Sequence, residues 1–126
     1  MIPTPVILTF PARAEYIRLV RLVASGMVAR AGFTIDDIED LRIGVDELCS
    51  LLVDHARPDA DVTVRFHVDS DVIVVDAETT ASVEGDVSLD ELSRHILKVA
   101  VDEHRVERIG AVVSVSLRKR RTLEPA

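Results

Sequence analysis

The stretch from Ile38 to Ala56 is long, periodic and free of proline. Thr34 supplies a capping residue before it, and Pro58 ends it. Apolar residues recur every three or four positions, which predicts a helix with one buried stripe. The stripe consists of Ile38, Leu41, Val45, Leu48 and Leu52. We therefore expect the rest of the chain to be organised around this helix.

A second, narrower line on the same helix runs through Gly44, Glu47 and Leu51. Glycine is a poor helix residue and costs roughly 1 kcal/mol relative to alanine. Its presence here indicates that something packs closely against the helix. Two explanations stand at this point: a small residue beneath a neighbouring helix, or a functional site beside the Glu47 carboxylate.

Length and composition limit the kind of protein this is. A chain of 126 residues predicts one domain, and 48% hydrophobic residues with only 3% aromatic ones predict an aliphatic core. No apolar run approaches the ~20 residues of a membrane span, and the N-terminus lacks the pattern of a signal peptide. The single cysteine, Cys49, suits a reducing compartment, so we predict a cytoplasmic protein with a buried, unreactive thiol.

The net charge of -7 argues against general binding to nucleic acid. The exception is a basic cluster, Arg118 to Arg121, which we interpret as part of a flexible, solvated tail over residues 118–126. The alternative is an electrostatic contact with an acidic partner. No histidine shares metal-ligand spacing with Cys49 or with carboxylates on one element, so no metal site is predicted.

Alternation and helical periodicity predict the remaining elements. Strands are expected at 6–10, 62–68, 72–75 and 111–117, with a short one around 105–107. Further helices are expected at 13–31 and after a capping box formed by Ser88 and Glu91. Asp76 is predicted to end its strand. The first strand is expected at a sheet edge, where it can pair with another copy of the chain.

The central helix resembles the N-box helix of the GHKL (Bergerat-fold) ATPases, and in particular their anti-sigma-factor branch of serine-kinase-like regulators. That branch reads leucine, arginine, leucine, alanine, valine, then Asp or Ser, then Glu. An Asn follows four residues later, and His-Ala or His-Gly eight or nine residues later. Here the corresponding run is Leu41 to Glu47, followed by His55 and Ala56. The position of the Asn is occupied by Leu51.

The resemblance implies a fold and a nucleotide site. The fold is a two-layer α+β sandwich, with a mixed, mostly antiparallel sheet of about four to five strands covered on one face by three helices. Glu47 would activate the attacking hydroxyl, and the position of Leu51 would hold magnesium. Asp76, at the start of a degenerate Asp-x-Gly-x-Gly motif that ends at Thr80, would accept a hydrogen bond from adenine.

The chain departs from the family at positions that matter chemically. Leucine offers no oxygen to magnesium, which requires hard oxygen ligands. Glu78 and Thr80 replace both glycines of the motif. The glycine-rich lid is absent, because the segment after Thr80 has a single glycine, Gly85, between two acidic residues. These changes predict that kinase turnover is lost; the alternative for Asp76 itself is a simple polar strand end.

The first predicted helix carries Arg18 and Arg21 one turn apart. In the anti-sigma branch an arginine on this helix contacts the sigma factor, and Arg21 is the matching position. An arginine can hold a carboxylate through two parallel hydrogen bonds. The alternative is that both arginines only solubilise an exposed face.

Three hypotheses follow. The first is an anti-sigma-like regulator that binds a sigma factor, an anti-anti-sigma protein or both, with nucleotide binding weakened or lost. The second is an active ATP-dependent serine kinase that phosphorylates the anti-anti-sigma partner and uses ATP and magnesium. The third is an α/β scaffold unrelated to sigma control. Membranes are not expected partners, and the sequence leaves open whether two copies pair through the first strand.

Overall fold

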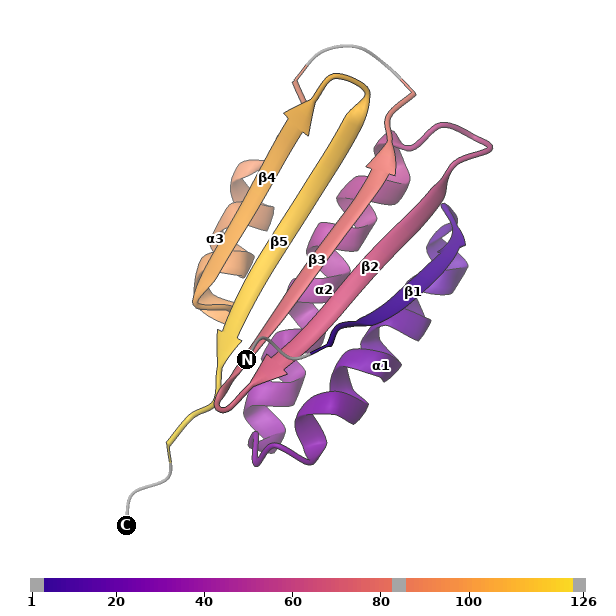
Figure 1. Cartoon of the computed structure of the whole chain (residues 1–126). Helices are drawn as coiled ribbons and strands as arrows, with labels where there is room; N and C mark the ends of the chain where they lie inside the picture. The colour runs from indigo at the N-terminus through magenta and orange to yellow at the C-terminus, as the bar shows by residue number, and fades with distance from the viewer. Residues whose placement is uncertain (1–3, 83–85, 124–126) are drawn as a thin grey trace.

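The computed structural model describes residues 4–82 and 86–123 of the chain. Five strands form one sheet, and three helices lie on one of its faces (Figure 1). In chain order the elements are β1 (Val6–Pro11), the 3-10 turn η1 (Ala14–Tyr16), α1 (Ile17–Ala29), α2 (Ile35–His55), β2 (Asp61–Asp69), β3 (Val72–Thr80), α3 (Glu91–Ala100), β4 (Glu103–Ile109) and β5 (Val112–Arg120). The predicted two-layer α+β fold is confirmed.

The sheet has the strand order β1-β2-β3-β5-β4, so β1 and β4 are its edges. All four pairings are antiparallel, whereas the sequence analysis allowed for a mixed sheet. Tight turns join β2 to β3 and β4 to β5, and the helices α1 and α2 connect β1 to β2. The connection from β3 to β4 passes through α3 and skips the position of β5, so β3 and β4 run in the same direction without pairing. The prediction that the first strand lies at an edge is correct.

The three helices divide the covered face of the sheet between them. α1 contacts β2, α2 lies over β3 and β5, and α3 contacts β4. The predicted stripe of α2 is buried at Leu41, Val45, Leu48 and Leu52, while Ile38 is partly exposed. Cys49 is also buried, and burial, with a smaller contribution from Asp46, raises the pKa of its thiol to about 12. The thiol is therefore unreactive at neutral pH.

Gly44 lies where α2 meets α3 and β5. A Cβ at this position would stand 2.7 Å from Val101 Cγ1 and 3.2 Å from Leu117 Cδ2. Close packing of neighbouring elements thus accounts for the glycine, as the first of the two explanations predicted. The carboxylate of Glu47 is not needed to explain it.

Several element ends differ from the sequence prediction. β3 does not end at Asp76 but continues to Thr80, and β4 is a full strand rather than a short one. The main part of the first helix begins at Ile17, after η1. α3 is capped by Asp90, whose carboxylate accepts a hydrogen bond from the Ser93 amide, and not by Ser88. Gly85, used in the prediction about the lid, lies outside the described residues.

The predicted basic tail is wrong over its first part. Arg118, Lys119 and Arg120 belong to β5 and pair with Val74, Ile73 and Val72 of β3. A one-residue slip would turn these side chains to the other face, so pairing fixes their direction. Residues 124–126 of the predicted tail lie outside the described part of the chain.

Residues just after β5 fasten the C-terminal segment to the start of α2. We call this cluster the Asp37 clasp: Asp37, Lys119, Arg121 and Thr122. The Thr122 amide and hydroxyl donate to the two Asp37 carboxylate oxygens at 2.9 and 2.6 Å, and Arg121 Nη1 donates to the Ala31 carbonyl at 2.9 Å. The clasp joins the α1–α2 corner to the last strand.

Within residues 4–82 and 86–123, no helix is long and apolar enough to cross a membrane.

Candidate functional site

The two N-box positions of α2, Glu47 and Leu51, lie one turn apart and are both partly exposed. Leu51 packs against the hydrophobic core, and its backbone carbonyl lies 2.9 Å from His55 Nδ1. Glu47 makes no hydrogen bond or ion pair with any residue in the described ranges. This surface of α2 therefore offers one unpaired carboxylate beside an apolar side chain.

The C-terminal end of α2 is joined to the end of β3 by backbone hydrogen bonds. The Arg57 amide donates to the Thr80 carbonyl at 2.9 Å, and the Ser82 amide donates to the His55 carbonyl at 2.8 Å. Ala56 and Ala81 form an isolated β-bridge between these bonds. The chain leaving β3 is thus held against the end of the N-box helix.

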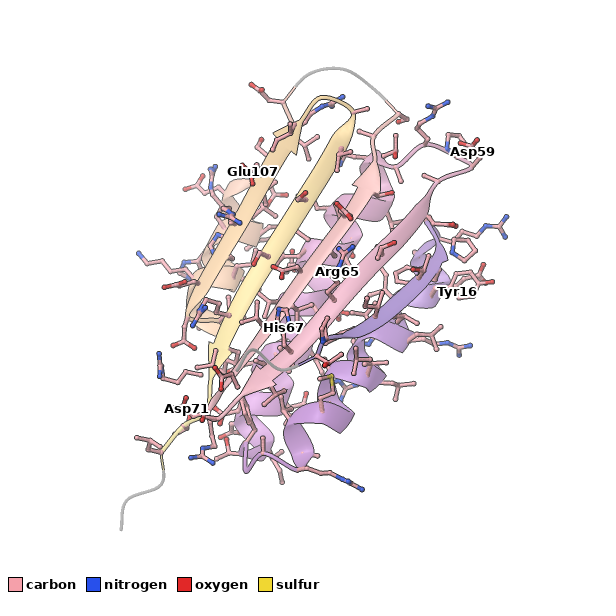
Figure 2. All side chains as sticks on the ribbon, viewed as in Figure 1. Tyr16, Asp59, Arg65, His67, Asp71 and Glu107 are labelled. Carbon is pink, nitrogen blue, oxygen red and sulfur yellow. The ribbon has the colours of Figure 1, made fainter. Side chains whose placement is uncertain are left out.

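Asp76 lies on the face of the sheet opposite to α2. Along β3, Val75 and Ala77 are buried in the core, while Asp76 and Glu78 alternate with them and are partly exposed. Successive side chains of a strand point to opposite faces. Asp76 stands across from Arg65 of β2 and Ser116 of β5, and Arg65 and His67 project from the uncovered face in Figure 2.

Interactions on this uncovered face engage both carboxylates of the degenerate motif, Asp76 and Glu78. His67 Nε2 lies 3.6 Å from Asp76 Oδ2, and Arg65 Nη1 donates to Glu78 Oε1 at 3.3 Å. Thr80 is two residues further along β3, in phase with Asp76 and Glu78. The structure therefore does not bring Asp76 and Thr80 together with Glu47 and Leu51.

Thr79 is the polar residue of β3 that faces the helices, and it is not among the predicted site residues. It is buried, and its hydroxyl donates to the Asp61 carbonyl at 2.8 Å. The sequence does indicate the position of Thr79, because the alternation of apolar and polar residues at Val75 and Ala77 continues through it. Reading β3 past Asp76 would have placed Thr79 on the covered face.

The two arginines of α1 have different surroundings. Arg18 is exposed. Arg21 Nη1 donates to Asp46 Oδ1 of α2 at 2.7 Å, in an ion pair whose side chains are 32% and 43% exposed. Leu22, which follows Arg21 and lies one turn after Arg18, is 66% exposed. The outer surface of α1 therefore presents an arginine with no ion pair to any described residue, a paired arginine and an exposed leucine.

The fit of these residues to a magnesium–nucleotide is poor. Within the part of the chain that the structure describes, no group of three or more His, Cys, Asp or Glu side chains could hold a metal ion. Leu51 has no ligand atom, and the carboxylate assigned to adenine is separated from Glu47 by the sheet.

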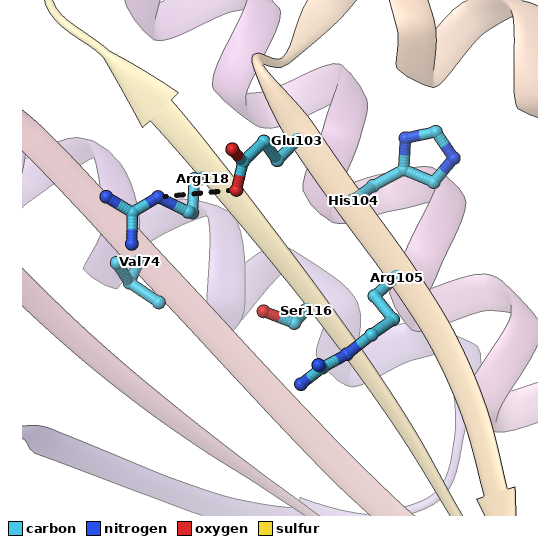
Figure 3. A pocket seen from close by; sticks show the side chains of 6 residues that line it. All are labelled: Val74, Glu103, His104, Arg105, Ser116 and Arg118. Carbon is cyan, nitrogen blue, oxygen red and sulfur yellow. Dashed lines mark ion pairs between the residues drawn. The ribbon is translucent and has the colours of Figure 1, made fainter.

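The uncovered face of the sheet contains shallow hollows instead. One of about 450 Å³ lies over β5 and β4 and is lined by Val74, Glu103, His104, Arg105, Ser116 and Arg118 (Figure 3). Arg118 Nε lies 3.6 Å from Glu103 Oε2 across it. A neighbouring hollow of about 270 Å³ includes Arg65 and Asp76. Charged side chains of both signs line these hollows, so neither has the uniformly basic character of a phosphate site.

Comparison with known proteins defines the class. Residues 10–94 match the model of the histidine kinase-like ATPase domain, which covers more than half of the chain. The chain belongs to this family. The matched residues include the whole of α2, the helix that resembles the N box.

Two individual relatives carry the same name, serine-protein kinase RsbW. The chain is similar to the serine-protein kinase RsbW of Bacillus licheniformis, at 34% identity over 86% of this chain and 81% of that protein. It is 50% identical to the serine-protein kinase RsbW of Bacillus velezensis over 52% of this chain. That match spans only 45% of the B. velezensis protein, about half its length.

A solved structure has the same fold. The crystal structure of the RsbU and RsbW domains of Rv1364c from Mycobacterium tuberculosis superposes with a TM-score of 0.74 over 94% of this chain and 32% of that chain. The sequence identity is 17%, so the likeness concerns the fold alone.

Proposed function

We propose that this protein is an anti-sigma-type regulator that captures a sigma factor, an anti-anti-sigma protein or both, and that its binding of ATP is weak or lost. The observation that carries the proposal is the placement of Asp76 on the opposite face from Glu47. Family membership and the RsbW relatives support the class, and Leu51 supports the loss of the metal site. Phosphoryl transfer depends on positioning and charge neutralisation, which separated groups do not supply.

The partner-binding surface in this proposal is the outer side of α1, with Arg18 and Arg21. Arg18 is free to take a carboxylate. Arg21 uses Nη1 for Asp46, and a guanidinium has further N–H groups for a partner. A partner carboxylate can therefore bind Arg21 beside Asp46 or replace it.

Replacing Arg18 and Arg21 with alanine is expected to weaken partner capture at least tenfold. Loss of the partly exposed Arg21–Asp46 pair should cost less than about 1 kcal/mol in the free energy of unfolding. The measurement is surface plasmon resonance with each purified sigma factor of the source organism, together with urea unfolding of the variant. Arg30→Ala, at an exposed arginine beyond α1, is the matched control. If Arg21→Ala unfolds the protein, that residue belongs to the structural core and not to the partner-binding surface.

The second candidate is a serine kinase that phosphorylates an anti-anti-sigma protein. The unpaired, partly exposed Glu47 favours it, as does the name of the RsbW relatives. Isothermal titration with ATP and magnesium separates the two functions. We expect no binding in the micromolar range; micromolar affinity, or transfer of labelled phosphate to the partner, would establish the kinase.

A further inference from the structure

β4 is a free edge of the sheet. It pairs with β5 along all of Glu103–Ile109, and no other strand in the described ranges pairs with it. An edge strand presents a row of backbone N–H and C=O groups that can accept another strand. This edge is therefore able to extend the sheet.

An apolar stripe on α3 overhangs this edge. Leu92 and Val99 are 68% and 71% exposed and lie two helical turns apart, with the partly exposed Ile96 between them. Leu97 faces α2, because its Cδ2 would lie 3.8 Å from a Cβ at Gly44. At about 100° per residue, Val99 is roughly 200° around the helix from Leu97 and so faces away from α2. Figure 1 shows α3 behind β4 and reaching past it.

The other side of the edge carries alternating charges. Glu103, Arg105 and Glu107 are exposed and in phase along β4, and Figure 3 shows Glu103 and Arg105 on the uncovered face with His104 directed away from them. Arg105 Nε lies 3.9 Å from Glu107 Oε2, and the Arg105 side chain is 72% exposed. Directly opposed charges on neighbouring strands attract or repel. A strand that complements this side of β4 therefore carries basic, acidic and basic side chains at alternate positions, whichever way it runs.

We propose that β4 and the apolar stripe of Leu92, Ile96 and Val99 form a docking groove, here called the β4 groove. Its occupant is an extended segment of a partner protein that adds a strand to β4. Alternate residues of that segment are apolar and pack on the stripe, and the others carry the basic, acidic, basic pattern. Strand addition of this kind obtains affinity from backbone hydrogen bonds and specificity from alternate side chains.

A bare strand fits this groove better than a second copy of the chain does. Two paired β4 strands would lie about 4.8 Å apart. In an antiparallel pair both α3 helices would lie on the same face of the joined sheet, and because each reaches past its own β4 (Figure 1), they would overlap across the seam. A segment without its own covering helix meets no such obstacle.

The test uses capped synthetic peptides. Lys-Val-Glu-Val-Lys has the complementary pattern. Glu-Val-Lys-Val-Lys is its control, with the same composition and net charge but with like charges facing Arg105 and, depending on the direction of the strand, either Glu103 or Glu107. We expect saturable binding of the first peptide by NMR titration, with shifts confined to β4 and α3, and about tenfold weaker binding of the second. Equal affinity for the two peptides, shifts elsewhere, or no binding at millimolar concentration would overturn the proposal.

Two variants test the two sides of the groove separately. Val99→Gln should weaken the first peptide about fivefold, whereas Lys98→Gln, at the neighbouring exposed position, should leave its affinity unchanged. Arg105→Glu should invert the preference, so that Lys-Val-Lys-Val-Lys binds better than Lys-Val-Glu-Val-Lys. Failure to invert would contradict the assigned register. Dimerisation of the chain that Val99→Gln abolishes would show that a second copy occupies the edge instead.

Discussion

Asp37→Ala is expected to lower the free energy of unfolding by about 3 kcal/mol, because the substitution breaks a buried, charged network. The Asp37 side chain is almost fully buried. It caps α2 with Thr34, accepts both hydrogen bonds from Thr122, and lies 4.0 Å from Lys119 Nζ. Removing it leaves a largely buried ammonium group with Asp40 as its remaining acidic neighbour.

Urea unfolding followed by circular dichroism measures this effect. Asp36→Ala is the matched control, since it removes the same charge from the same helical turn at an exposed position. The control should change stability by at most about 0.5 kcal/mol. A similar loss in both variants would show that the charge of the first turn matters and the clasp does not.

The same residue gives the protein an expected acid sensitivity. Burial by itself would raise the pKa of Asp37, but hydrogen bonds from Thr122 and Thr34 outweigh it and hold the pKa below the ordinary 3.8. A carboxyl group with a lowered folded-state pKa stabilises the protein above its unfolded pKa, and this stability is lost as pH falls through the folded value. The stability gap between wild type and Asp37→Ala should therefore narrow below about pH 4. A gap that stays constant to pH 2 would contradict the role of the charge.

Gly44→Ala is expected to destabilise the protein although alanine is the better helix former. The new Cβ would meet Val101 Cγ1 at 2.7 Å, and the side chain of a β-branched residue has little freedom to move away. Overpacking of this kind costs about 1–3 kcal/mol, against a gain of roughly 1 kcal/mol in helix propensity. The expected net loss is therefore up to about 2 kcal/mol.

Gly26→Ala, in α1, is the control for that experiment. Apart from its chain neighbours and the backbone of its own helix, no atom of residues 4–82 or 86–123 lies within 4 Å of the Cβ that this substitution adds, so only the propensity gain remains. This variant should be more stable than the wild type by about 0.5–1 kcal/mol. Thermal and urea unfolding of both variants would then give changes of opposite sign for one chemical substitution. Equal signs would show that the contact with Val101 is not tight in solution.

The sequence predicted the helical layer well because its signals are local. The stripe of α2 repeats over several turns, and Thr34 begins the helix with a capping box that includes Asp37. The ends of the strands are less well predicted from the sequence. The charge of Asp76 predicts the end of β3, whereas the small residues Ala77 and Thr79 keep the alternation on the covered face.

The course of the chain after Leu117 could not be predicted for a different reason. Apolar alternation stops there, yet β5 continues because Arg120 bonds to Asp102 and Asp71 and because Lys119 approaches Asp37 and Asp40. These contacts join residues far apart in the sequence. The surroundings of Asp76 were hard to predict for a similar reason, because the face to which its side chain points depends on the register of β3 against β2 and β5 and not on the motif around it.

The alternation of β3 makes the sheet a partition between two compartments of side chains. Residues on the helical side determine whether the chain folds, whereas those on the other side tolerate exchange at little structural cost. A protein built in this way can acquire new surface chemistry on one side while its interior stays constant. The proposed loss of nucleotide binding would not endanger such a fold, since the positions concerned keep their places in the sheet.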